Sequence, residues 1–299
     1  MTTPATELAA LPIRVRLCNG EGLISYSHRL AEHNHSLVED IERGIRERGI
    51  RIPHRRVTPE RARVWRELGG LHPRAFTTPA TLNGEAVTDR WICRGCARGE
   101  PAMGRTPHIG LVCLRHRRWI GEPQRDIHNY PPALAAEHIY RRVLKPRGVL
   151  VDAFAMDIGK ICAHPIFIGT NEIQRRINHS GIDDTAILTY PEQVGFARLM
   201  TRKSFLEYVT DPALEQPQRR QRVSREVAQI LPDRADGEAV RAFDRIWEVV
   251  LRLKTLRRET LLWGAPIRDT YYNLLRFIDL HDMAADDDIW AGTPKADSR

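Results

Sequence analysis

The sequence predicts a mainly α-helical protein with one small β-hairpin module inserted in it. Apolar residues recur at intervals of three and four over much of the 299-residue chain, which is the period of an amphipathic helix. Capping and turn residues divide these periodic segments into separate helices. Between residues 90 and 121 the helical period is lost, and closely spaced cysteines appear instead.

Residues 1–89 are predicted to form an N-terminal helical region. Apolar spacing indicates one helix beginning near Leu23 and a second from Leu37 to Ile45. A third helix begins at Thr58-Pro59-Glu60, which supplies a capping residue, a first-turn proline and a carboxylate near the positive end of the helix dipole. From about 72 to 88 prolines and a glycine interrupt the pattern, which predicts a linker.

Residues 133–299 are predicted to form a helical C-terminal region, separated from the module by Asn129-Tyr-Pro-Pro132. The periodic segments indicate helices near 134–145, from 191 to 209, from 237 to 262 and near 271–278. The segment 237–262 is the longest of them.

The charge is concentrated in one third of the chain. The net charge is +8, and residues 51–150 hold 19 basic and 8 acidic side chains, a net of +11. Such a field favours a polyanionic partner such as nucleic acid. No apolar run approaches the roughly 18 residues that cross a bilayer, and the N-terminus lacks the pattern of a signal peptide. We therefore expect a cytoplasmic protein without a membrane partner.

The module carries the sharpest motif in the sequence. Cys93-Arg-Gly-Cys96 is followed after sixteen residues by Cys113-Leu-Arg-His116. Two pairs of ligands, each separated by two residues, are typical of a zinc ribbon with tetrahedral coordination. Four protein ligands leave no open position for water, so we expect one structural zinc ion rather than a catalytic one.

Arginine is abundant around these ligands. Glu100 is the only acidic residue between 90 and 118, so the module stays positive after zinc and three thiolates are counted. Arginine binds phosphate in bidentate geometry. The predicted DNA contacts in the module are Arg94, Arg98, Arg115, Arg117 and Arg118.

A second set of DNA contacts is predicted in the C-terminal region. Residues 152–179 have the outline of a helix-turn-helix, although an ordinary helical hairpin is favoured because the segment between the two helices is apolar. The second helix would place Arg175 and Arg176 on DNA. A basic stretch at 218–225 opens a further helix and is interpreted as a solvated face, with a phosphate contact as the alternative.

Two segments together resemble the TniQ family of proteins that select DNA targets in transposition. One is the order Glu21, then Ser25-Tyr26, then Arg29-Leu30-Ala31, then Asn34, and the other is Trp91 directly before the cysteine and histidine pairs. The resemblance covers roughly residues 12 to 121. It implies that the chain marks a DNA site and recruits a transposition regulatory ATPase.

The chain also departs from the family pattern. Arg94 stands where many members have proline, and a further cysteine pair after His116 is absent. One zinc ion is therefore expected.

Motifs for catalysis are missing. The sequence has no phosphate-binding glycine loop, no Gly-x-Ser-x-Gly and no His-Glu-x-x-His. A metal-dependent nuclease using His116, His128 and Asn129 is the enzyme alternative, and it is disfavoured. The prediction is a DNA-binding targeting adaptor that is not an enzyme; the alternative is a zinc-stapled protein-interaction scaffold that binds no nucleic acid.

Overall fold

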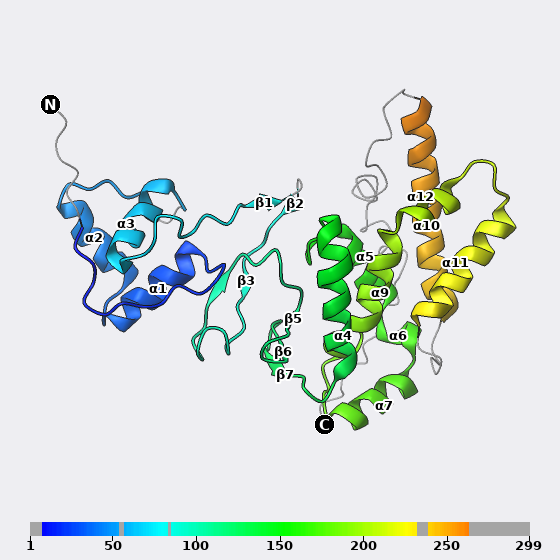
Figure 1. Cartoon of the computed structure of the whole chain (residues 1–299), viewed down its shortest axis with the longest axis horizontal. Helices are drawn as coiled ribbons and strands as arrows, with labels where there is room; N and C mark the ends of the chain where they lie inside the picture. The colour runs from blue at the N-terminus through cyan, green and yellow to red at the C-terminus, as the bar shows by residue number, and fades with distance from the viewer. Residues whose placement is uncertain (1–7, 54–56, 83–84, 232–238, 263–299) are drawn as a thin grey trace, which may run out of the picture. The chain divides into compact units, whose positions relative to one another are not determined.

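The computed structural model describes residues 8–53, 57–82, 85–231 and 239–262. Within them the chain is mainly helical with short antiparallel hairpins, as the sequence predicts (Figure 1). It divides into two compact units, Met1–His128 and Asn129–Arg299. None of the described helices combines the length and apolar character needed to cross a bilayer.

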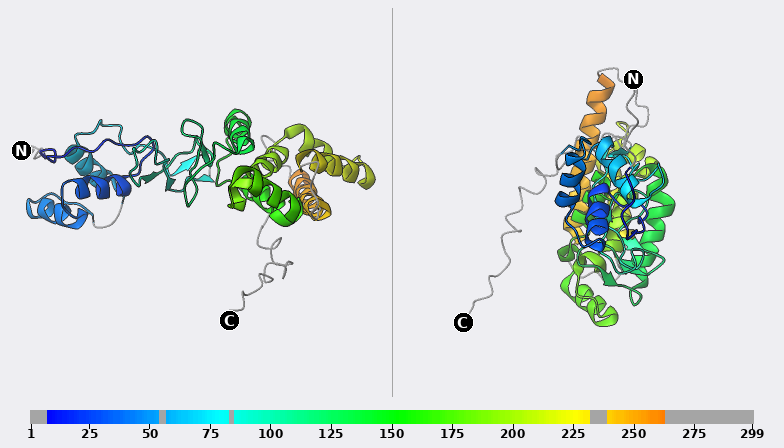
Figure 2. Two further views of the ribbon diagram at one scale, coloured as in Figure 1. Left: turned by 90° about the horizontal axis from the view of Figure 1, so that it is seen from below. Right: turned by 90° about the vertical axis from the view of Figure 1, so that its left-hand side faces the viewer.

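The first unit begins with three helices, α1 (Leu23–His33), α2 (Val38–Glu47) and α3 (Pro59–Gly69). The predicted start of the third is confirmed, because the Thr58 hydroxyl accepts a hydrogen bond from the Arg61 amide at 3.2 Å. Tyr26, Leu30 and Trp65 are fully buried among the three helices. These helices gather in one cluster (Figure 2).

Short strands follow the helices. The segment predicted as a linker contains a small hairpin, and the module extends beyond residue 121, because a third strand completes its second sheet. Both differences have one cause: strands of two residues carry no periodic pattern. The pairs are β1 (Thr81–Leu82) with β2 (Glu85–Ala86), β3 (Arg90–Trp91) with β4 (Met103–Gly104), and β5 (Val112–Cys113) with β6 (Arg118–Trp119) and β7 (Arg125–Asp126).

The second unit is built from helices. Helix α4 (Pro131–Ile139) continues as a π-helical turn, η1 (Tyr140–Leu144), and a 3-10 turn, η2 (Lys145–Arg147), so helical geometry runs through Pro146, before which the sequence predicted an end. The other helices are α5 (Phe154–Cys162), α6 (Pro165–Ile168), α7 (Thr170–Ser180), α8 (Thr185–Leu188), α9 (Tyr190–Met200), α10 (Lys203–Thr210), α11 (Gln216–Ile230) and α12 (Ala239–Leu262).

Helix α9 is the centre of the second unit. It packs most extensively on α5 and also contacts α4, α10 and α11 (Figure 1). Gly159 permits the close approach of α5, since a Cβ there would collide with the Gln193 carbonyl oxygen. Met156, Phe196 and Ile246 are among the fully buried core residues contributed by α5, α9 and α12.

Two further sequence predictions need correction in this unit. The apolar segment inside residues 152–179 is the helix α6, with Phe167 and Ile168 buried, and α5 packs on α9 and α12. The segment therefore forms neither a helix-turn-helix nor a simple hairpin. The helix predicted over 191–209 is interrupted at Thr201, whose hydroxyl donates to the Ala197 carbonyl at 2.9 Å. The predicted helix near 271–278 lies outside the described residues.

Candidate metal centre

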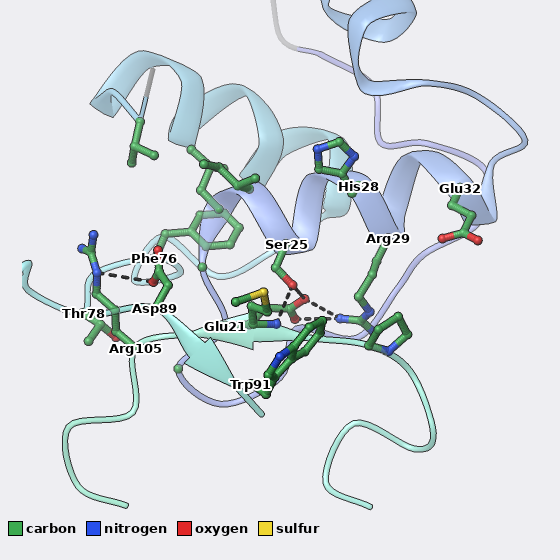
Figure 3. A pocket seen from close by; sticks show the side chains of 17 residues that line it. Glu21, Ser25, His28, Arg29, Glu32, Phe76, Thr78, Asp89, Trp91 and Arg105 are labelled. Carbon is green, nitrogen blue, oxygen red and sulfur yellow. Dashed lines mark hydrogen bonds and ion pairs between the residues drawn. The ribbon is translucent and has the colours of Figure 1, made fainter. Parts of the chain in front are cut away.

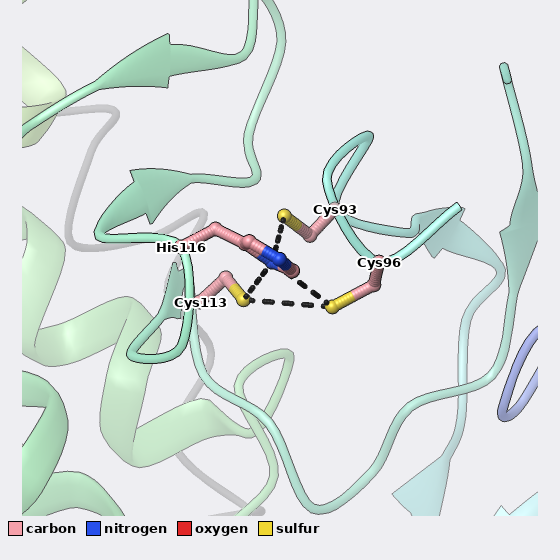
Figure 4. Close-up of side chains that lie close together, drawn as sticks. All are labelled: Cys93, Cys96, Cys113 and His116. Carbon is pink, nitrogen blue, oxygen red and sulfur yellow. Dashed lines mark hydrogen bonds between the residues drawn. The ribbon is translucent and has the colours of Figure 1, made fainter. Parts of the chain in front are cut away.

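Two hairpin turns bring the predicted ligands together. Cys93 and Cys96 lie between β3 and β4, whereas Cys113 and His116 lie at the turn between β5 and β6. Figure 4 shows their side chains pointing toward one another. One ligand atom from each residue lies within 4.8 Å of all the others, so the cluster could hold a metal ion. It is the one such group of three or more Cys, His, Asp or Glu side chains within the described residues.

The measured distances define a compact cluster. The His116 Nδ1 atom lies 3.6 Å from the Cys93 sulfur, 3.4 Å from the Cys96 sulfur and 3.5 Å from the Cys113 sulfur. The sulfurs of Cys96 and Cys113 are 3.7 Å apart. Cys93 and Cys113 are buried, while Cys96 is exposed, so the cluster lies at the surface of the unit.

Backbone turns present the first cysteine pair. The Ala97 amide donates to the Cys93 carbonyl at 3.0 Å, and Arg98 adopts a left-handed conformation with a φ of 56°. Gly95 allows the histidine to approach, because a Cβ there would lie 2.7 Å from Cγ of the His116 ring. Glycine is therefore required at this position because the two turns lie in close contact there.

The thiols share their protons unevenly. A hydrogen bond with Cys93 lowers the pKa of Cys113 to about 4 and raises the pKa of Cys93. Partial burial raises the pKa of Cys96. One thiolate is therefore favoured in the cluster before metal binds, and a divalent cation would release the remaining thiol protons.

Polar contacts hold the loops on which the ligands lie. The Arg90 guanidinium donates to the carbonyls of Thr106 and Ile109, each at 2.9 Å. Gln124 links the start of the first cysteine turn to the second sheet, donating to the Ile92 carbonyl and accepting from the Arg94 amide. The Arg90 guanidinium therefore stabilises the loop through these hydrogen bonds.

The predicted arginine contacts in the module differ in exposure. Arg94, Arg98, Arg115 and Arg117 are exposed, and each lies within two residues of a ligand. No ion pair joins any of these four guanidinium groups to a carboxylate within the described part of the chain. Arg118 is only half-buried and lies opposite Asp126 in the sheet. We name the four exposed side chains the knuckle arginines.

The predicted contacts on α7 have different surroundings. Arg176 is 8% exposed, and its guanidinium binds Glu172 at 2.8 Å and Glu192 at 2.7 Å. A buried arginine held by two carboxylates is not available to a phosphate, so we withdraw Arg176 from the predicted contacts. Arg175 is exposed and already bound to Glu172 at 2.6 Å; as a DNA contact it stays a prediction.

Three residues of the segment from Glu21 to Asn34, namely Glu21, Ser25 and Arg29, take part in a set of internal contacts that we call the clamp. Arg29 binds Glu21 at 2.7 Å and Glu100 at 2.5 Å, and the Ser25 hydroxyl donates to Glu21 at 3.0 Å. The Ser25 hydroxyl also accepts the Met103 amide at 2.9 Å. Glu100 and Met103 belong to the hairpin that carries the first cysteine pair, so the clamp ties α1 to the metal centre.

A cleft of about 400 Å³ opens beside this clamp. Figure 3 shows Trp91 and Phe76 on its walls and the group formed by Glu21, Ser25 and Arg29. Ile24 lines the cleft and is 47% exposed. The cleft offers an apolar surface in the first unit.

The nuclease alternative gains no second cluster. His128 Nδ1 lies 2.6 Å from an Asp126 carboxylate oxygen, and both side chains are exposed. His116 faces the three cysteines instead.

No protein-family model, curated protein or solved structure matches the chain.

Proposed function

We propose that the chain is a DNA-binding adaptor in which one structural zinc ion holds the knuckle arginines in position. The observation that carries the proposal is the coincidence of four exposed, unpaired arginines with a complete set of four ligands. Because each arginine is within two residues of a ligand, the metal would fix the backbone from which every one of them projects.

Zinc is proposed because the donors and their spacing suit it. A zinc ion about 2.3 Å from sulfur and about 2.0 Å from nitrogen separates tetrahedral ligands by about 3.8 Å for S to S and about 3.5 Å for S to N. The cluster has 3.7 Å between the sulfurs of Cys96 and Cys113 and 3.4 to 3.6 Å from sulfur to the His116 nitrogen. Three thiolates also favour an ion that accepts soft ligands.

Targeting and partner recruitment rest on the TniQ resemblance. The proposal is that the DNA-bound chain recruits a regulatory ATPase of transposition in the cytoplasm, where thiols stay reduced. The clamp supports the association of the two segments that carry the resemblance, because Glu21, Ser25 and Arg29 join the hairpin of the Cys/His module to α1.

The salt dependence of duplex binding tests the proposal. Each phosphate contact steepens the log-log dependence of affinity on salt by about 0.9, so replacing Arg98, Arg115 and Arg117 by Ala should make the slope shallower by about 2 to 3. The weakening should be similar for unrelated duplex sequences. Metal content is measured alongside, because Arg115 and Arg117 flank a ligand.

A matched control removes the same charge elsewhere in the unit. Arg48, Arg51 and Arg74 are exposed and lie outside the module, so their replacement by Ala should change the slope far less. An unchanged slope in the metal-loaded Arg98, Arg115 and Arg117 variant would place the interface elsewhere. The nuclease alternative is tested by incubating the chain with duplex DNA and magnesium or manganese. The duplexes should stay intact. Nicking by the wild type that a His128→Ala variant no longer produces would favour the nuclease.

A second candidate function is the zinc-stapled interaction scaffold. The apolar cleft with the exposed Ile24 favours it, because a partner's apolar side chain would cover that surface. If the wild-type chain binds no duplex at low salt, this candidate replaces the adaptor.

A further inference from the structure

A second group of arginines lies in the helical unit, where the ends of several elements meet. Arg147 ends the 3-10 turn, Arg198 and Arg202 lie at the end of α9 and just after it, and Arg222 lies on α11. Helix α9 contacts both α11 and the π-helical turn η1 that leads into the 3-10 turn. We name Arg147, Arg198, Arg202 and Arg222 the Arg147 cluster. It does not include Arg175 or Arg176.

The cluster has little compensating charge. Glu226 binds Arg202 at 2.6 Å and Arg222 at 2.9 Å, and its side chain is 8% exposed. Arg147 and Arg198 make no ion pair with a carboxylate within the described residues. Burial, Arg198 and Arg202 together lower the pKa of Arg147. Four guanidinium groups are thus balanced by one carboxylate.

Neighbouring groups hold the cluster in place. Arg202 lies over the Phe205 ring at 5.6 Å, and Arg222 lies over the Tyr208 ring at the same distance. The Arg147 Nη1 atom donates to the Thr201 hydroxyl at 3.1 Å. Side chains fixed in this way lose less conformational entropy when they bind a ligand.

Hydrogen-bonding capacity remains for a ligand. The Nε atoms of Arg202 and Arg222 are buried, so the groups open to a ligand at the surface are the exposed guanidinium groups of Arg147 and Arg198. The Arg198 guanidinium takes part in no hydrogen bond recorded within the described residues. A tetrahedral anion with several oxygens matches a group of planar guanidinium forks better than a single carboxylate does.

We propose that the Arg147 cluster binds phosphate groups of the duplex DNA backbone, as a second contact besides the knuckle arginines. The inference rests on the proposed function and adds to it a role for the helical unit. Its residues are spread from 147 to 222, so the sequence does not mark them as one group, although Arg222 belongs to the basic stretch 218–225. Phosphate contacts position a protein on DNA without reading sequence, which is the task the cluster would perform.

The test compares two double variants of the full-length chain on duplex DNA over a range of salt. Replacing Arg147 and Arg198 by Gln leaves the pairs of Glu226 intact and should make the log-log salt slope shallower by about 1 to 2. Lys160 and Lys254 are exposed and take no part in the cluster, so their replacement by Gln serves as the matched control with an unchanged slope. The metal content of all chains should be equal.

The outcomes separate this inference from the proposed function. If the wild type binds duplex and the Arg147 and Arg198 variant keeps the wild-type slope, the inference is overturned while the adaptor proposal stands. If the wild type binds no duplex, both fail. If the wild type binds no duplex, calorimetry with inorganic pyrophosphate shows whether the cluster binds free phosphate compounds instead. Pyrophosphate binding that the double variant loses would then assign the cluster to such compounds and overturn its assignment to DNA.

Discussion

The Cys/His module and the helical unit differ in what holds them together. The described strands of the module have two residues each, and its buried apolar groups form small clusters around Ala102 and Ile120. The helical unit buries residues such as Phe196 and Ile246 between long helices. Ligands can fasten loops too short to bury a core, whereas helices need an apolar face to pack.

This difference decides where arginines are available. In the module the knuckle arginines are exposed and form no ion pair with a carboxylate among the described residues. In the helical unit packing draws Arg176 inside, where Glu172 and Glu192 neutralise it. Arg147 and Arg198 of the Arg147 cluster remain exposed in that unit.

Removing ligands should produce the largest effect on the module. Because the binding free energy of structural zinc is on the order of 10 kcal/mol or more, replacing Cys93 and Cys113 by Ser should abolish metal binding and unfold the module. The helical unit should keep its hydrogen-exchange protection. Metal analysis of the purified chain gives the first readout.

Cys162→Ala provides the control, since this buried cysteine lies on α5 and should leave one metal ion per chain. A wild type that holds almost no metal, or a double serine variant that holds a full equivalent, would contradict the assignment of the site.

Removing a core side chain of the helical unit should destabilise that unit and leave the metal centre unchanged. Phe196 is fully buried on α9, so Phe196→Ala should lower the free energy of unfolding of the helical unit by about 3 to 5 kcal/mol. Denaturant titration followed by circular dichroism measures the change. Metal content should stay at the wild-type value, and its loss would show that the two regions are not stabilised separately.

Gly95→Ala should have a smaller effect, confined to the metal centre. The added Cβ would lie 2.7 Å from the His116 ring and displace it, so metal affinity should fall by about 10- to 100-fold, as for other groups that orient a ligand. A competition titration with a chelator measures this affinity. Gly44→Ala on α2 is the control, because its Cβ meets nothing within 4 Å; equal affinities in the two variants would show that Gly95 does not position His116.

The sequence predicts much of the first unit because its signals are local. The spacing of the Cys and His pairs is enough to identify the cluster, and the cap at Thr58 marks the start of α3. The short hairpin between Thr81 and Ala86 and the strand β7 leave no comparable pattern.

What the sequence does not show depends on tertiary contacts. Arg175 and Arg176 are neighbours in sequence, yet only Arg176 turns toward the buried Glu192. The Arg147 cluster exists because α9 and α11 pack together. The sequence does contain one weak indication that Arg176 is paired. Glu172 lies four residues before it, a spacing that forms ion pairs on a helix.

A cycle of metal removal and return tests most directly whether the metal presents the knuckle arginines to DNA. Duplex affinity is measured on the purified chain, after chelation, and after addition of one equivalent of zinc, with circular dichroism recorded at each step. Chelation should weaken binding and make the salt slope shallower while the helical signal persists, and zinc should restore both. A chelated chain that keeps the same affinity and the same slope would contradict the role assigned to the metal centre.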